Sequence, residues 1–131
     1  MQPHAQYRRN RILTATPGEL IVMMYDGVLQ RVAQAKGHCD EKRWGPMGEQ
    51  LGRAQDILFE LIATLNPEHA PELCDRLQWL YGYCSRTLLE AMRTQDTARL
   101  DEVTSLLRPL RDAWAEAARS ARTALPMAVN G

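Results

Sequence analysis

The sequence predicts an all-α protein, an antiparallel up-down four-helix bundle with a flexible N-terminal arm. Apolar residues recur at spacings of three and four along four segments of roughly 20 residues, which is the helical period. Short connections containing Gly, Pro or Asn separate these segments and favour antiparallel neighbours. No stretch alternates polar and apolar residues as a half-buried strand would. We therefore expect an arm at 1–13, a bundle at 14–124 and a flexible tail at 125–131.

The first helix is expected from about Pro17 to Gly37. Thr16 can serve as its N-cap, Pro17 takes the first helical position, and Glu19 follows the cap by three residues, which is a capping box. The apolar residues at 20–25 then run without a break and cover the whole circumference of the helix. This helix is therefore either central in the fold or offers a second apolar face to a partner.

The other three helices are expected at about Met47–Leu65, Pro71–Thr94 and Thr97–Ala124. Trp44 lies in the Gly-rich connection before the second helix, and we expect it to pack over one end of the bundle. Pro109 interrupts the last segment and is expected to kink it, because proline lacks the backbone N–H that a helix needs.

Composition excludes several classes of protein. The chain has 16 Lys and Arg and 16 Asp and Glu, so its zero net charge does not call for nucleic acid or an anionic membrane. Arg8, Arg9 and Arg11 form a small basic cluster, which reads as a solvated arm because no basic stripe extends it. No apolar run is long enough to insert into a membrane, and the first residues lack the apolar core of a signal peptide. We expect a cytoplasmic protein with three reduced cysteines.

The chain carries no pattern that predicts an enzyme, a cofactor or a metal. Helical bundles often hold two metal ions with Glu-x-x-His pairs, and this chain has none. His4, His38 and His69 fall in the arm, a loop and a helix start, and neither a phosphate loop nor a GxSxG motif is present. The rival hypothesis of a metal bundle would require stoichiometric metal in the purified protein.

Surplus apolar surface is the remaining signal. Met23 and Met24 form a flexible thioether pair, and Trp79 and Tyr83 lie four residues apart on one side of the third helix. These side chains are either core residues or the walls of a groove that accepts a partner's helix.

Four blocks of the sequence, preceded by Tyr7, resemble the flagellar secretion chaperone family, FliS. The blocks are TATPGELIVMMYDGVL at 14–29, RAQDILFELIATLN at 53–66, LQWLYGYCSRTLLEAMRTQD at 77–96 and LLRPLRDAW at 106–114. They occur in the family's order and cover nearly the whole chain. The pattern departs from the family at Pro109, where a helix former is usual.

The resemblance implies a cytoplasmic export chaperone that binds the disordered C-terminal segment of flagellin. It also implies that the chaperone blocks premature polymerisation and delivers flagellin to a component of the flagellar type III export gate, as a monomer or a weak homodimer. The alternatives are a helical-bundle secretion chaperone or regulator for a different export substrate, and a bundle that self-associates through its first helix.

The resemblance also assigns roles to individual residues. Tyr7 matches a tyrosine associated with docking to the export gate, and the arm that carries it is a candidate cover for the groove. Tyr25, Asp26 and Gly27 match the family's YDG block and are expected to be mainly structural. No motif fixes the flagellin-binding groove, for which our candidates are Met23, Ile57, Leu61, Trp79 and Tyr83.

Overall fold

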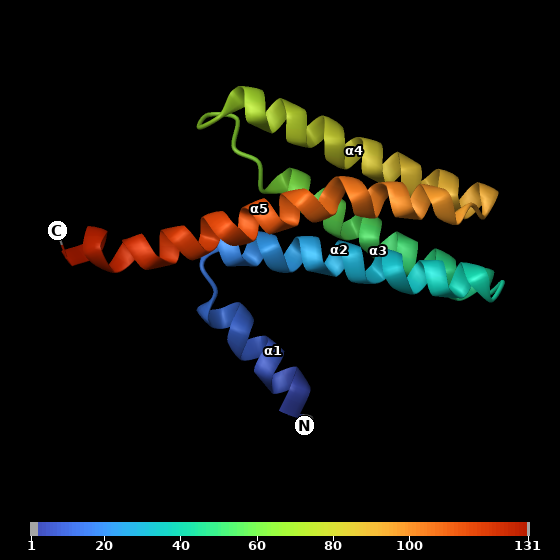
Figure 1. The fold of residues 1–131 in the computed structure, drawn as a ribbon, viewed down its shortest axis with the longest axis horizontal. Coiled ribbons are helices and arrows are strands. Elements are labelled where there is room, and N and C mark those ends of the chain that lie inside the picture. Colours follow the sequence, from blue (N-terminus) through green and yellow to red (C-terminus); the bar gives the residue numbers. More distant parts are fainter. Residues whose placement is uncertain (1–2, 131) are drawn as a thin grey trace.

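The computed structural model describes the backbone of residues 3–130 and the side chains of residues 5–122. Within this part of the chain there are five α-helices and no strand (Figure 1). The all-α prediction is confirmed, although the described residues form five helices instead of the four expected. The helices are α1 (Pro3–Thr14), α2 (Pro17–Asp40), α3 (Trp44–Ala63), α4 (Pro71–Thr94) and α5 (Thr97–Asn130).

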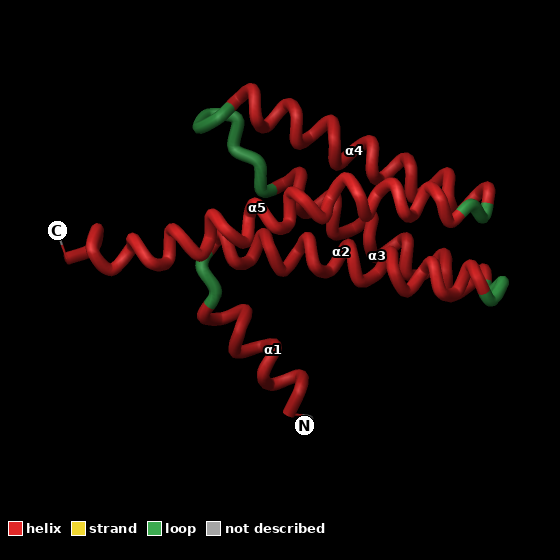
Figure 2. Tube along the Cα trace, in the orientation of Figure 1, coloured by secondary structure: helices red, strands yellow, loops and turns green. Residues whose placement is uncertain are grey.

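Helices α2 to α5 pack around one core and are called the bundle below. Helix α3 packs against α2, α4 against α3, and α5 against both α4 and α2, with successive helices running in opposite directions (Figure 1). Helix α1 lies outside the bundle and is joined to α2 by residues 15–16. The longest connection, residues 64–70, leads to the end of α4 that stands away from the other helices (Figure 2).

The core explains why these segments pack as helices. Most of its residues occupy the positions that the spacing of three and four predicts, and each large apolar side chain stabilises the fold by roughly 1.5–3 kcal/mol on burial. Met47 and Tyr81 also belong to the core. The largest fully buried side chains are Tyr25, Tyr81, Met47, Leu51, Leu58, Leu61, Leu88, Leu100, Leu107, Val28, Val32 and Val103.

Local hydrogen bonds set the ends of α2. The backbone N–H of Glu19 donates to Oγ1 of Thr16 over 3.2 Å, so the predicted N-cap is confirmed. The predicted end at Gly37 is wrong, because α2 continues to Asp40. The left-handed residue that follows the helix is Lys42, with φ of 58°, which leaves Gly37 an ordinary helical position.

The expected N-terminal arm contains a helix, since residues 3–14 form α1. The hydroxyl of Thr14 donates to the backbone oxygen of Asn10 over 2.9 Å, which is a bond within the helix itself. Backbone hydrogen bonds inside a helix require no packing partner. A segment with few apolar residues can therefore be helical while contributing nothing to the core.

Two further expectations change near the other connections. Trp44 opens α3 with its side chain 42% exposed, so it is not part of the buried core. Helix α5 stays helical through Pro109, and Figure 1 shows its axis changing direction near the middle. The tail expected at 125–131 is helical as far as Asn130, and Gly131 lies outside the described residues.

Candidate functional site

An apolar cavity of about 530 Å³ lies between the N-terminal half of α4 and residues of α2 and α5. Figure 2 shows that this half of α4 stands away from the other helices. Pockets of roughly 300–1,000 Å³ with mostly apolar walls are typical of binding sites. Its walls come from α2, α4 and α5 and from the connection between α3 and α4. They are Pro17, Gly18, Leu20, Ile21, Met24, Thr64, Leu65, Asn66, His69, Leu73, Cys74, Leu77, Tyr81 and Trp114.

A pair of buried tyrosines lies beside this cavity. The hydroxyls of Tyr25 and Tyr81 share a hydrogen bond of 2.6 Å, and their rings meet edge to face with centroids 6.1 Å apart. Burial raises the pKa of both hydroxyls above their usual value, so both groups stay neutral at neutral pH. Because Tyr81 also borders the cavity, this pair joins the cavity wall to the core of α2.

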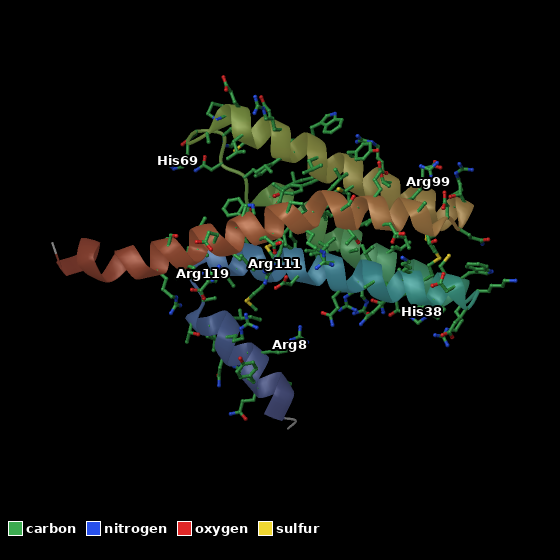
Figure 3. The ribbon with its side chains drawn as sticks, viewed as in Figure 1. Arg8, His38, His69, Arg99, Arg111 and Arg119 are labelled. Carbon is green, nitrogen blue, oxygen red and sulfur yellow. The ribbon has the colours of Figure 1, made fainter. Side chains whose placement is uncertain are left out.

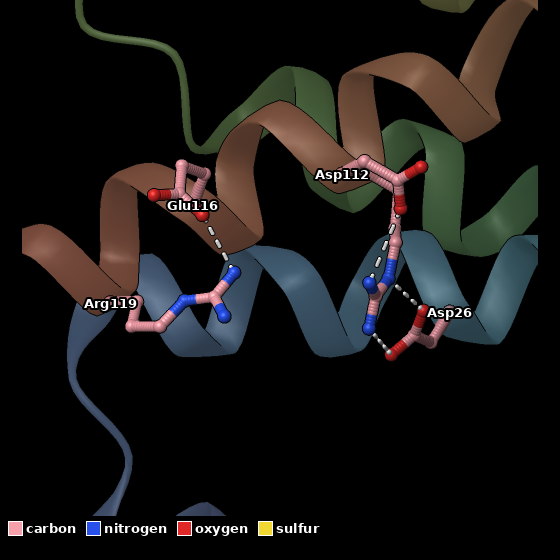
Figure 4. Close-up of polar contacts among 5 residues, drawn as sticks. Asp26, Asp112, Glu116 and Arg119 are labelled. Carbon is pink, nitrogen blue, oxygen red and sulfur yellow. Dashed lines mark hydrogen bonds and ion pairs between the residues drawn. The ribbon is translucent and has the colours of Figure 1, made fainter.

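Two arginines of α5 pair with acidic residues of α2, and these two helices form one side of the cavity. Arg111 donates from Nε to Oδ1 of Asp26 over 2.7 Å and from Nη2 to Oδ2 over 3.4 Å (Figure 4). Further along α5, Arg122 pairs with Glu19 near the start of α2. Partly exposed ion pairs contribute only about 0.2–1 kcal/mol each, so their effect is mainly to align the two helices.

The opposite wall is less constrained. Among the described residues, the hydrogen bonds that join α4 to its neighbours involve the hydroxyls of Tyr81 and Tyr83 and the backbone oxygen of Ser85, which accepts from the Gln55 side chain. The part of α4 that precedes Tyr81 contacts the cavity through apolar side chains, including Leu73, which is 51% exposed. The cavity therefore has one wall fixed by polar contacts and one wall held by apolar contacts.

The residues of the YDG block lie at contacts between helices. Tyr25 is completely buried, and Asp26 accepts from Arg111 across the α2–α5 contact. A Cβ atom on Gly27 would lie 3.1 Å from Cδ1 of Ile57, so the glycine leaves room for α3 to approach.

The five predicted groove residues do not share one surface. Leu61 is completely buried in the core, so its expected place on an open groove is wrong; its position on the apolar seam of α3 decides its burial. Ile57 is half-buried against the same core. Met23 lies on another side, in a cleft beside α1.

Trp79 and Tyr83 form an aromatic strip on α4. Their rings stack with centroids 5.4 Å apart and an angle of 13° between planes. The Tyr83 hydroxyl donates to Oε2 of Glu102 on α5 over 2.8 Å, and that carboxylate raises the pKa of Tyr83. Trp79 is 64% exposed, and Leu106 is exposed one turn beyond Glu102. This strip is a second apolar surface at the junction of α4 and α5.

Tyr7 is exposed on α1 and faces α2 across a cleft of about 340 Å³. Arg8 and Arg11 of the same helix line this cleft together with Met23 of α2. Tyr7 therefore lies away from the apolar cavity, on the opposite side of α2.

The described residues contain no group of three or more His, Cys, Asp or Glu side chains that could hold a metal ion. Cys39, Cys74 and Cys84 are buried and unpaired, and burial raises the pKa of Cys84 to about 12. Within the same part of the chain, none of the helices is both long enough and apolar enough to span a membrane.

Sequence reasoning missed the cavity itself. Leu73 and Trp114 recur at the helical spacing with other apolar residues, while Leu20 and Met24 belong to the unbroken apolar run of α2. The available signal was that Leu73 follows the longest connection, where a helix can lose its neighbour.

The family described as flagellar protein FliS matches residues 1–121 of this chain. The flagellar secretion chaperone FliS of Bacillus subtilis is 37% identical over 120 residues, which cover 92% of this chain and 89% of the relative. The flagellar secretion chaperone FliS of Escherichia coli is 32% identical over 106 residues, covering 80% and 78%.

A crystal structure of a flagellar chaperone from bacteria superimposes with a TM-score of 0.75. The match covers 90% of this chain and 99% of the solved chain, at 21% sequence identity. At that identity the superposition demonstrates a shared helical fold.

Proposed function

We propose that this chain, which belongs to the FliS family of flagellar secretion chaperones, binds the C-terminal segment of flagellin. Binding occurs in the cytoplasm, prevents flagellin from polymerising prematurely and delivers it to the flagellar type III export apparatus. The observation that carries this proposal is the apolar cavity between the diverging N-terminal half of α4 and the aligned pair of α2 and α5.

The shape and chemistry of the cavity fit a client that folds as it binds. A disordered segment with an apolar face can become helical in a groove between helices, and the contacts it gains offset the entropy it loses. The wall formed by α4 can adjust to such a client because apolar contacts hold it. The strip of Trp79 and Tyr83 supplies further apolar surface for a segment that continues around the bundle.

Docking to the export gate is assigned to another part of the molecule. Tyr7 lies on α1, outside the bundle, so a gate component can contact it while flagellin occupies the cavity. The chaperone acts as a monomer or weak homodimer, and its role requires no catalytic group.

The test is inhibition of flagellin polymerisation. Light scattering would follow flagellin monomers seeded with short filaments, with and without an equimolar amount of this protein. We expect the chaperone to suppress elongation, and a variant with Met24→Asp, which buries a charge in the cavity wall, to lose that effect. The exposed substitution Phe59→Asp on α3 is the matched control. Unchanged polymerisation in the presence of folded chaperone would count against flagellin as the client and favour a different export substrate.

A further inference from the structure

The cleft between α1 and α2 carries positive charge that the fold leaves unbalanced. Helix α1 has Arg8, Arg9 and Arg11 and no acidic residue. Arg8 and Arg11 line the cleft, and Figure 3 shows Arg8 projecting from α1 on the side of the bundle. Neither guanidinium has a carboxylate partner among the described residues.

The one carboxylate in the cleft does not neutralise them. Asp26 borders the cleft from α2, but Arg111 of α5 already occupies both of its oxygens, over 2.7 and 3.4 Å. A guanidinium and a carboxylate in this paired geometry satisfy one another. Arg8 and Arg11 therefore remain available to an anion that comes from outside.

Helical geometry sorts the three arginines of α1. Residues at spacings of three and four share one side of a helix, so Tyr7 and Arg11 lie together and Arg8 joins them. Arg9 does not line this cleft, but borders a second hollow together with Arg8 and Leu13. The sequence alone presents one basic cluster, whereas in the structure Arg8 and Arg11 line the cleft and Arg9 does not.

We infer that the cleft between α1 and α2 binds an acidic peptide segment of the docking partner, with Arg8 and Arg11 holding its carboxylates. This inference rests on the docking role proposed for α1, and it specifies that the segment of the partner that binds there is acidic. Tyr7 and Met23 supply aromatic and thioether surface between the charges, which suits a peptide that alternates acidic and apolar residues. A nucleic acid or an anionic membrane would require a broader basic surface, and the zero net charge of the chain does not provide one.

The experiment uses the full chain and a short fluorescent peptide with Asp residues on either side of a Leu-Phe pair. A matched peptide carries Asn in place of Asp. We expect saturable binding of the Asp peptide at low salt, and Arg8→Glu or Arg11→Glu to weaken it by about five- to tenfold. Arg9→Glu makes the same change in charge on α1 outside the cleft and should leave affinity within about twofold.

Other outcomes would overturn the inference. If the Asn peptide bound equally well, the cleft would not recognise carboxylates. If Arg9→Glu weakened binding as much as Arg8→Glu or Arg11→Glu, the effect would come from the net charge of α1 and not from this cleft. Tighter binding of single-stranded RNA or of vesicles with anionic lipid than of the Asp peptide would assign the cleft to another kind of partner. The same variants are titrated with the C-terminal segment of flagellin: absence of that binding in the unmodified chain refutes the proposed function, whereas the peptide result alone decides the chemistry of the cleft.

Discussion

Leu61 lies in the core and Leu73 lies in the cavity wall, so the same substitution at the two positions should have different effects. Leu61 is completely buried, so Leu61→Ala loses the transfer energy of its side chain and leaves a void, at a cost of about 3–5 kcal/mol. Leu73 is 51% exposed and already borders the open cavity. Since about half of a burial energy of roughly 2 kcal/mol is at stake and no closed void forms, Leu73→Ala should cost about 1 kcal/mol.

Urea denaturation followed by circular dichroism measures both free energies of unfolding, and titration with the C-terminal segment of flagellin measures affinity. We expect Leu73→Ala to remain well folded and to bind about five- to tenfold more weakly, because it removes part of the apolar wall. The reasoning is refuted if Leu73→Ala is as destabilising as Leu61→Ala, or if it binds flagellin as tightly as the unmodified chain.

Three further predictions concern other parts of the site. Tyr25→Phe should lower the free energy of unfolding by about 1–3 kcal/mol, because it leaves the buried hydroxyl of Tyr81 without its partner. The variant with both tyrosines changed to Phe should lose less stability than the sum of the two single changes. Additive losses in urea denaturation would contradict the shared hydrogen bond. The raised pKa of both tyrosines means that the unfolded chain loses protons first, so stability should fall as pH rises above about 10, and less steeply in the double variant. Trp79→Ala should keep the helical circular dichroism signal and weaken flagellin binding about tenfold, whereas loss of cooperative melting would make Trp79 a core residue. Tyr7→Ala should leave flagellin binding intact and reduce recruitment to the export gate in a pull-down assay, and an equal loss of both would oppose separate sites.

The helices of the bundle were predictable because their signals are local. Thr16 caps α2 through a bond to a residue three positions away, and periodic apolar residues select the buried face of each helix. Helix α1 was missed because its sequence lacks periodic apolar residues, although its hydrogen bonds are also local. The end of α2 was misjudged because a lysine, Lys42, adopts the left-handed conformation usually taken by glycine.

The site was less predictable because it depends on relations between distant residues. Asp26 and Arg111 are 85 positions apart, and no spacing rule pairs them. The cavity exists because α4 diverges after a long connection, which depends on the packing of whole helices. Trp79 and Tyr83 were correctly recognised as neighbours, since a spacing of four brings side chains together on a helix. The apolar spacing along α3 predicts that Leu61 is buried, and it was a better guide than the choice of Leu61 as a groove residue.

Calorimetric titration of the full chain with the C-terminal segment of flagellin from the same organism tests the central claim most directly. We expect saturable one-to-one binding, a negative change in heat capacity and a gain in helical circular dichroism, because apolar surface is buried while the segment folds. The absence of heat and of helix gain, with the chaperone folded and the segment soluble, would contradict the claim that this cavity receives flagellin.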